Sequence, residues 1–347
     1  MKMKDCNCLR KFVALTFLAL LYCDCVRAET TQIPAISPNT SYVCDSASVI
    51  AAMDSELKRS LSRLKNAGKA PVYYLAYRLY EGKRDSISAS DGALLDFRRG
   101  GNWRMLSVDL RVGNCHFDNT HFLRGEDSSA PTFWERASKL ESILPDGGAG
   151  LPLQQCLWMT TDEAYKSAQQ RYSELTVNHE VMSAEDDKSD DFSFQPVRNY
   201  QSTLKNITFD RTEWTERVRR LSQLFLKYPN FTSSEVTFTA DPMTRYMVNS
   251  EGSKIVEQHF SYLVSIKASA LAKDGMQLSL ADSVNVVDPS LLPDEAALSK
   301  KVEKLAVSLE QLCQAPVAEP HVGPAILSGR AAAVFFHETF GHRVEAV

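Results

Sequence analysis

Two histidines and a glutamate lie close together near the end of the chain, in the segment His337-Glu338-Thr339-Phe340-Gly341-His342. Imidazole is the commonest protein ligand for zinc, and a glutamate beside a metal-bound water can take its proton. The residue types and their proximity therefore indicate part of a metallopeptidase.

The spacing of the two histidines is unusual for a zinc helix. The familiar arrangement places them at i and i+4, about 40° apart around the helix axis. Here they are separated by five positions, which is about 140° on a regular α-helix, so the two rings would point apart. We expect a bulge or a helix end at Gly341 that turns His342 back towards His337, because glycine leaves helical dihedrals without steric cost.

The residues before the motif indicate how it is held. Pro324-Ala325-Ile326-Leu327 is a candidate short strand, and Ser328 can cap a following helix. The segment Ala331–Phe336 consists of helix formers and bulky apolar residues, so we expect this helix to be buried and to mount the ligands rigidly. The alternative is that Glu338 only solvates a helix end and that the histidines have structural roles.

The C-terminal segment closely resembles the TldD/PmbA family of metallopeptidases, whose TldD-type members carry an HExxxH helix. The similarity extends over Gly323–Glu345, and a weaker one covers Val248-Asn249-Ser250-Glu251-Gly252. The resemblance implies that His337 and His342 bind Zn²⁺ and that Glu338 is the general base. It further implies extended or unfolded peptide substrates, an enclosed site, and a homo- or heterodimer with a homologous subunit.

The resemblance also implies a third metal ligand, a cysteine well downstream of the motif. The chain ends at Val347, and a catalytic zinc generally needs three protein ligands. We therefore expect the 347-residue chain to be inactive by itself and a longer parent to be the enzyme. The alternative function is an exported, non-catalytic peptide-binding or assembly subunit of a TldD/PmbA-like complex.

The N-terminus has the pattern of an export signal. Four basic residues lie before an apolar run at Phe12–Tyr22, and Val26-Arg27-Ala28 suits a signal peptidase. The run is too short to span a bilayer, so we expect residues 1–28 to be a signal peptide and the mature protein to be periplasmic or secreted, with no membrane span. A lipoprotein acylated at Cys23 is the less favoured alternative, because Tyr22 is bulky for the position before it.

Charge and cysteine content limit the partners. The formal net charge is −4 for the whole chain and becomes −7 without residues 1–28, which gives no electrostatic reason to bind nucleic acid. Removal of the signal leaves Cys44, Cys115, Cys156 and Cys313, which permit three full disulfide pairings.

One further group of residues, Cys115, His116, Asp118 and His121, has ligand chemistry and could hold a metal, although a loop with a disulfide cysteine explains it equally well. The acidic stretch Glu185–Asp191 has the composition of a solvated connection without a binding role.

Helices and strands alternate between the two ends, which predicts an α+β fold with antiparallel or mixed sheets. Apolar residues at helical spacing predict helices at 45–68, 161–175, 214–228 and 298–312, the second opened by Thr161. Strand patterns lie at 72–80, 86–90, 106–112, 236–240, 246–248, 262–270 and 277–281. We expect an N-terminal α+β domain at 29–228 and the incomplete start of a β-rich catalytic domain at 229–347.

Overall fold

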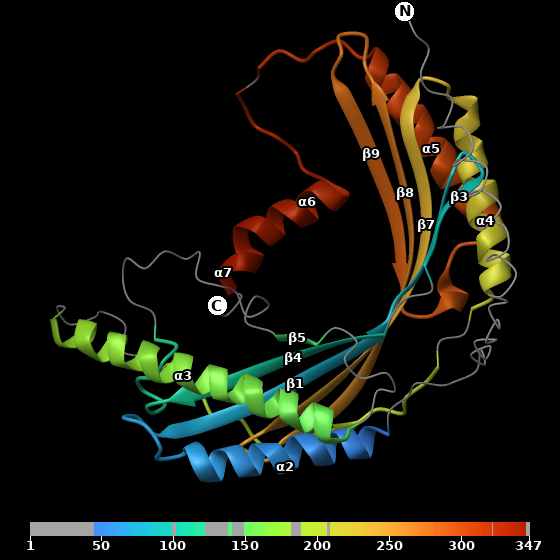
Figure 1. The fold of residues 1–347 in the computed structure, drawn as a ribbon. Coiled ribbons are helices and arrows are strands. Elements are labelled where there is room, and N and C mark those ends of the chain that lie inside the picture. The colour runs from blue at the N-terminus through green and yellow to red at the C-terminus, as the bar shows by residue number, and fades with distance from the viewer. Residues whose placement is uncertain are drawn as a thin grey trace, which may run out of the picture. The chain divides into compact units, whose positions relative to one another are not determined.

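The structure is a computed structural model that describes residues 45–98, 102–121, 138–140, 149–181, 189–206, 209–320 and 322–344. The expected signal peptide at 1–28, Cys44 and most of the acidic stretch lie outside these residues. No helix in the described ranges is long and apolar enough to cross a membrane. The described residues combine helices with one mainly antiparallel sheet, which confirms the predicted α+β class (Figure 1).

Within the described residues the sheet contains nine strands, most of which lie where the sequence patterns predict strands. They are β1 (Val72–Lys83), β2 (Asp85–Ser90), β3 (Ala93–Arg98), β4 (Asn102–Val112), β5 (Ser138–Leu140), β6 (Asn199–Gln201), β7 (Phe231–Asn249), β8 (Lys254–Leu271) and β9 (Gln277–Val286). Among the described residues, the strands pair antiparallel except β6 with β8, which is parallel.

The central strand is β7, which pairs with β8 along one edge and with both β1 and β2 along the other. The pairing with β2 extends to Ala240 and the pairing with β1 begins at Met243, so Pro242 lies at the break between them. Proline has no N–H to donate and is tolerated in a strand where no ladder bond is needed. One strand therefore covers a stretch in which the sequence predicts two, at 236–240 and 246–248.

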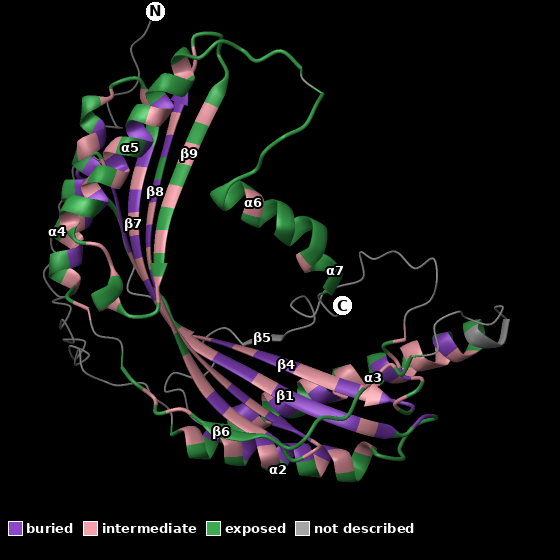
Figure 2. Ribbon diagram, turned by 180° about the vertical axis from the view of Figure 1, so that it is seen from behind, coloured by how far each residue is buried: buried purple, intermediate pink, exposed green. Residues whose placement is uncertain are grey.

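Two hydrophobic cores lie between this sheet and its helices (Figures 1 and 2). The helices are α2 (Ser46–Leu64), α3 (Leu151–Val181), α4 (Arg211–Gln223), which continues into the 3₁₀ turn η1 (Leu224–Lys227), and α5 (Glu295–Gln314). Residues of α4 and α5 pack with β2, β7, β8 and β9 in one core, where Trp214 stacks on Phe238 with ring centroids 4.0 Å apart. Residues of α2 and α3 pack with β1, β4 and the other halves of β7 and β8 in the second.

Both cores therefore share β7 and β8, and strands from both sides of the expected boundary at 228/229 belong to one sheet. The sheet does not divide at that point. The division of the whole protein into domains stays a prediction.

Helix α3 begins at Leu151, so the prediction that Thr161 opens it was wrong. Thr161 lies within the helix, where its hydroxyl donates to the carbonyl of Leu157 at 2.6 Å and lies 2.7 Å from the hydroxyl of buried Tyr77. A threonine in a helix can make this bond to the preceding turn and resemble a cap in sequence. Pro152, in the first turn, was the better signal for the start.

Candidate metal centre

The HExxxH motif lies on a short helix that changes its winding at the first histidine. Helix α6 (Gly329–Phe336) leads into a π-helical turn, η3 (His337–Gly341), which is followed by α7 (His342–Val344). In a π-helix the backbone bonds join residues five apart, in place of four. The hydrogen bond of such a turn therefore joins residues at the spacing that separates the two histidines.

The π turn brings the two histidines together. The backbone N–H of His342 donates to the carbonyl of His337, which is the five-residue bond expected of such a turn. The ring centroids of the two imidazoles lie 4.4 Å apart with an interplanar angle of 62°. The distortion predicted from the spacing is therefore confirmed, and the two rings lie side by side.

Glu338 completes this cluster. One carboxylate oxygen, Oε2, lies 3.6 Å from Nε2 of His342. A nitrogen from each ring and one oxygen of Glu338 all lie within 4.8 Å of one another. Imidazole nitrogen and carboxylate oxygen are both donors that zinc accepts, so the residues present fit a zinc ion. Their roles as ligands and base stay predictions.

Two small features accompany the π turn. The hydroxyl of Thr339 donates to the carbonyl of Phe335 at 2.7 Å, a bond to the preceding turn that threonine can make in a helix. A β-carbon at Gly341 would approach the ring of His337, so the glycine leaves space for that ring. Nothing in the residue type of Thr339 predicts this contact, and its place within the motif is the only signal for one.

The apolar face of the motif helix is exposed, so the prediction of a buried helix was wrong (Figure 2). Phe335, Phe336 and Phe340 are 58%, 61% and 51% exposed. Nor do residues 324–327 form a strand, and Ser328 occupies the N-cap position without a side-chain hydrogen bond. The apolar composition had indicated burial, but no described element covers this face.

A polar contact ties the start of α6 to the sheet. Nη2 of Arg330 lies 2.8 Å from Oδ1 of Asp282 on β9, and Nη1 donates to the carbonyl of Ala281 at 3.3 Å. Lys301 of α5 contacts the other oxygen of Asp282 at 3.0 Å. Burial raises the pKa of the Asp282 carboxyl, but the hydrogen bonds from Lys301 and Arg330 outweigh this and hold the pKa below its usual value.

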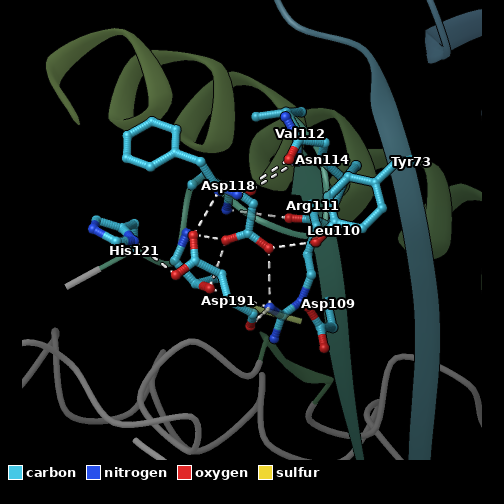
Figure 3. A network of polar contacts seen from close by, with 12 residues as sticks. Tyr73, Asp109, Leu110, Arg111, Val112, Asn114, Asp118, His121 and Asp191 are labelled. Atoms are coloured by element: carbon cyan, nitrogen blue, oxygen red, sulfur yellow. Dashed lines mark hydrogen bonds and ion pairs between the residues drawn. The ribbon is translucent and has the colours of Figure 1, made fainter. Parts of the chain in front are cut away.

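The four residues Cys115, His116, Asp118 and His121 do not form one cluster. Cys115 and His116 meet Asp190, while Asp118 and His121 both contact Asp191. The backbone N–H of Asp118 and Nδ1 of His121 lie 2.8 and 2.7 Å from its carboxylate oxygens (Figure 3).

The end of the acidic stretch is therefore held by the folded protein. The interpretation as a solvated connection was wrong for Asp191, whose side chain is 12% exposed, whereas Asp190 is exposed and contacts His116. Composition identified the charge of these residues and could not identify their partners, which lie about 70 positions earlier in the chain.

Among the described cysteines, Cys115, Cys156 and Cys313 are all free thiols. None of the disulfide pairings that the sequence leaves open is therefore formed among these three cysteines. Cys44 lies outside the described residues.

Comparisons with known proteins give similarities in structure only. No protein-family model and no curated protein matches the chain. The chain is similar in structure to TldE from Thermococcus kodakarensis, with 11% identity over 75% of this chain and 47% of that one and a TM-score of 0.40.

Two further structures are also similar to the chain. A candidate modulator of DNA gyrase from Thermotoga maritima has 9% identity and a TM-score of 0.41, and one from Bacteroides thetaiotaomicron has 13% and 0.42. Each similarity covers 75% of this chain and 48% of the other. The chain thus spans about half the length of the structures it matches.

Proposed function

We propose that the chain carries the zinc-binding helix of an exported metallopeptidase that hydrolyses peptide bonds in extended or unfolded peptides. The observation that supports this most directly is the π turn at His337–Gly341. It places two imidazoles with an unfavourable spacing side by side, and it keeps a carboxylate within 4.8 Å of their nitrogens.

In this proposal His337 and His342 hold the metal and do no further chemistry. When bound, zinc polarises the scissile carbonyl and acidifies the attacking water. Glu338 accepts the proton of that water and delivers it to the leaving amine, which is the work of a general base followed by a general acid. Its position next to His342, 3.6 Å from Nε2, is suited to this role.

The proposed enzyme is larger than the chain described here. Two imidazoles do not complete a catalytic zinc site, which takes three protein ligands and an open position. We propose that a cysteine of a longer parent chain is the third ligand, as the family resemblance implies. The exposed phenylalanines of α6 and η3 support a site that is covered by further protein, either from the same chain or from a homologous subunit of a dimer.

A test uses the full-length parent protein, with zinc content and cleavage of an unfolded casein substrate as the two measurements. Glu338→Gln is expected to keep zinc and to lose cleavage by about 100-fold or more, since general-base catalysis contributes about 10² to 10⁴. His337→Ala and His342→Ala are expected to lose both. Glu310→Gln, an exposed glutamate of α5, is the control and should change neither.

The outcomes also separate the peptidase from the alternative, a non-catalytic peptide-binding or assembly subunit. Full cleavage by Glu338→Gln would overturn the assignment of the base. A parent that binds casein and neither holds zinc nor cleaves it would favour the binding subunit.

A further inference from the structure

A second group of metal-binding side chains lies away from the motif helix, where two distant segments meet. Cys115 and His116 follow β4, and Asp190 lies 74 positions after His116. The Cys115 sulfur, a ring nitrogen of His116 and a carboxylate oxygen of Asp190 all lie within 4.8 Å of one another. Nδ1 of His116 and Oδ1 of Asp190 are in direct hydrogen-bond contact.

The backbone around this group is fixed on both sides. The N–H of Phe192 donates to the carbonyl of Cys115 at 3.1 Å, which joins the two segments next to the donor atoms. The side chain of Asn114 accepts from the N–H of His116 at 2.9 Å and shapes the turn. The Cys115 and Asp190 side chains are therefore held close by bonds that do not involve their own donor atoms.

A buried polar network anchors the neighbouring residues (Figure 3). Asp118 is fully buried and accepts from the hydroxyl of Tyr73 at 2.5 Å and from Nη1 of Arg111 at 3.1 Å. Its own backbone N–H donates to Asp191, whose other oxygen contacts His121. Because Asp191 is fixed to a buried residue, its neighbour Asp190 is presented to Cys115 and His116 in a defined place.

Contacts of the Phe192 ring also hold the segment at 189–194 in place. The guanidinium of Arg111 lies 4.7 Å from the ring centroid of Phe192. That ring also packs against Tyr74 of β1, with centroids 4.6 Å apart. The segment that carries Asp190 therefore packs against strand β1 of the sheet.

The donor set has a clear chemical preference. A thiolate, an imidazole and a carboxylate together suit a borderline-soft divalent ion, zinc above all, and leave a fourth position for water. In a tetrahedral zinc site, bonds of about 2.0 to 2.3 Å place neighbouring ligand atoms about 3.4 to 3.7 Å apart. A separation of at most 4.8 Å therefore needs only a small side-chain adjustment.

We propose that Cys115, His116 and Asp190 form a second zinc site, independent of the HExxxH motif, that clips the loop after β4 to the segment at 189–194. The metal takes the place of the His116–Asp190 hydrogen bond, and the imidazole keeps its one N–H on the ring nitrogen that does not bind the metal. Only the thiol of Cys115 must lose its proton to become a ligand, so binding releases that proton and weakens in acid. The site stabilises the folded chain, because only the folded state brings the three donors together.

Cobalt is the probe for the test, because Co²⁺ takes the place of zinc and a cobalt–thiolate bond gives a charge-transfer band in the near ultraviolet. The reduced 347-residue chain is expected to show this band at one equivalent of Co²⁺ and to lose it on addition of Zn²⁺. Cys115→Ser should abolish the band. His116→Ala and Asp190→Asn should weaken metal binding by at least about tenfold, as even the loss of a ligand's supporting partner does.

Matched controls separate this site from others. Cys156→Ser and Cys313→Ser remove equally free thiols and should keep the band. The double variant His337→Ala/His342→Ala should also keep it, so failure of the proposed peptidase would leave this result unchanged. Absence of the band from the wild-type chain, or its persistence in Cys115→Ser, would overturn the proposal.

A second measurement does not depend on the folding of any variant. Alkylation of Cys115 in the wild-type chain, followed by mass spectrometry, is expected to slow at least tenfold when Zn²⁺ is present, while that of Cys156 is unchanged. Equal alkylation of Cys115 with and without Zn²⁺ contradicts the site. A disulfide between Cys44 and Cys115 in protein isolated from its native compartment would contradict it too.

Discussion

A β-carbon added to Gly341 would lie 3.2 Å from Nδ1 of His337, closer than side-chain contacts usually allow. Gly341 is not among the glycines with positive φ, so what it supplies is space for the first imidazole. The bulge predicted at this residue is present, and its physical reason differs from the dihedral freedom that we expected.

Gly341→Ala is therefore expected to separate helix stability from metal binding. Alanine favours a helix over glycine by about 1 kcal/mol, so the helical signal of the chain should be unchanged or slightly higher. The added methyl group moves the ring of His337, and zinc affinity of the full-length parent should fall about tenfold, as when the orientation of a ligand is disturbed. Competition with a zinc-binding dye measures this, and unchanged affinity would count against a metal held by His337.

The hydroxyl of Thr339 should matter to the motif although it carries no catalytic role. Thr339→Val keeps the shape and removes the bond to the carbonyl of Phe335, at a cost of about 1 kcal/mol or about fivefold in zinc affinity. Thr339→Ser keeps the donor and serves as the control. If the valine and serine variants bind zinc equally well in the same dye competition, the bond does not support the π turn.

The attachment of α6 to β9 should weaken in acid. The pKa of Asp282 is lower in the folded chain than in the unfolded chain. Its contribution is therefore present above the unfolded value of about 3.9 and is lost as the pH falls through the folded value.

At neutral pH, Asp282→Asn should increase hydrogen exchange of the α6 amides by up to about fivefold, since an exposed ion pair contributes at most about 1 kcal/mol. Arg330→Gln should do the same. Lys301→Gln, which removes only the contact from α5, should leave α6 unaffected. If both Asp282→Asn and Arg330→Gln leave the exchange unchanged, the anchor has no role in solution.

The network around Asp118 should contribute strongly to stability. Asp118→Asn removes the fully buried carboxylate that pairs with Arg111, but Arg111 keeps its contact with Asp109 at 3.3 Å, so the loss should be about 1 to 3 kcal/mol. Tyr73→Phe removes one donor to the same carboxylate and should cost about 1 to 3 kcal/mol. Urea unfolding without metal measures both.

His116→Ala is the comparison for these two variants. His116 is 76% exposed, so its substitution should change the metal-free stability by less than about 0.5 kcal/mol. If all three variants lose a similar free energy of unfolding, the buried position of Asp118 does not account for its contribution to stability.

Local patterns predicted much of the fold. Dense aromatic and apolar residues located β1, and alternation located β4. The Asp91-Gly92 pair, in which both residues have positive φ, marks the turn that ends β2. Helix α5 follows its leucine spacing from its cap at Asp294. Such signals are local, because they depend on each residue's own conformation and on which face it buries.

The features that the sequence did not predict depend on contacts between distant residues. Nothing near Asp190 indicates that Cys115 lies beside it, and no local pattern shows that one strand passes from one core to the other. The apolar run of α6 identified a helix correctly, but exposure depends on which other elements cover it, and composition cannot supply that. The motif was more predictable, because a five-residue spacing restricts the helix geometries that bring two rings together.

The pairing of β1 with β7 has a consequence for how the protein matures. Ala76 pairs with Asn249. Strand β1 is therefore synthesised long before β7, the strand with which it pairs. During that interval one edge of an apolar strand lacks its neighbour, and unpaired edges of this kind invite association with other chains. The newly made polypeptide should therefore need a holding chaperone until β7 emerges, and should fold slowly because its contacts are so distant in sequence.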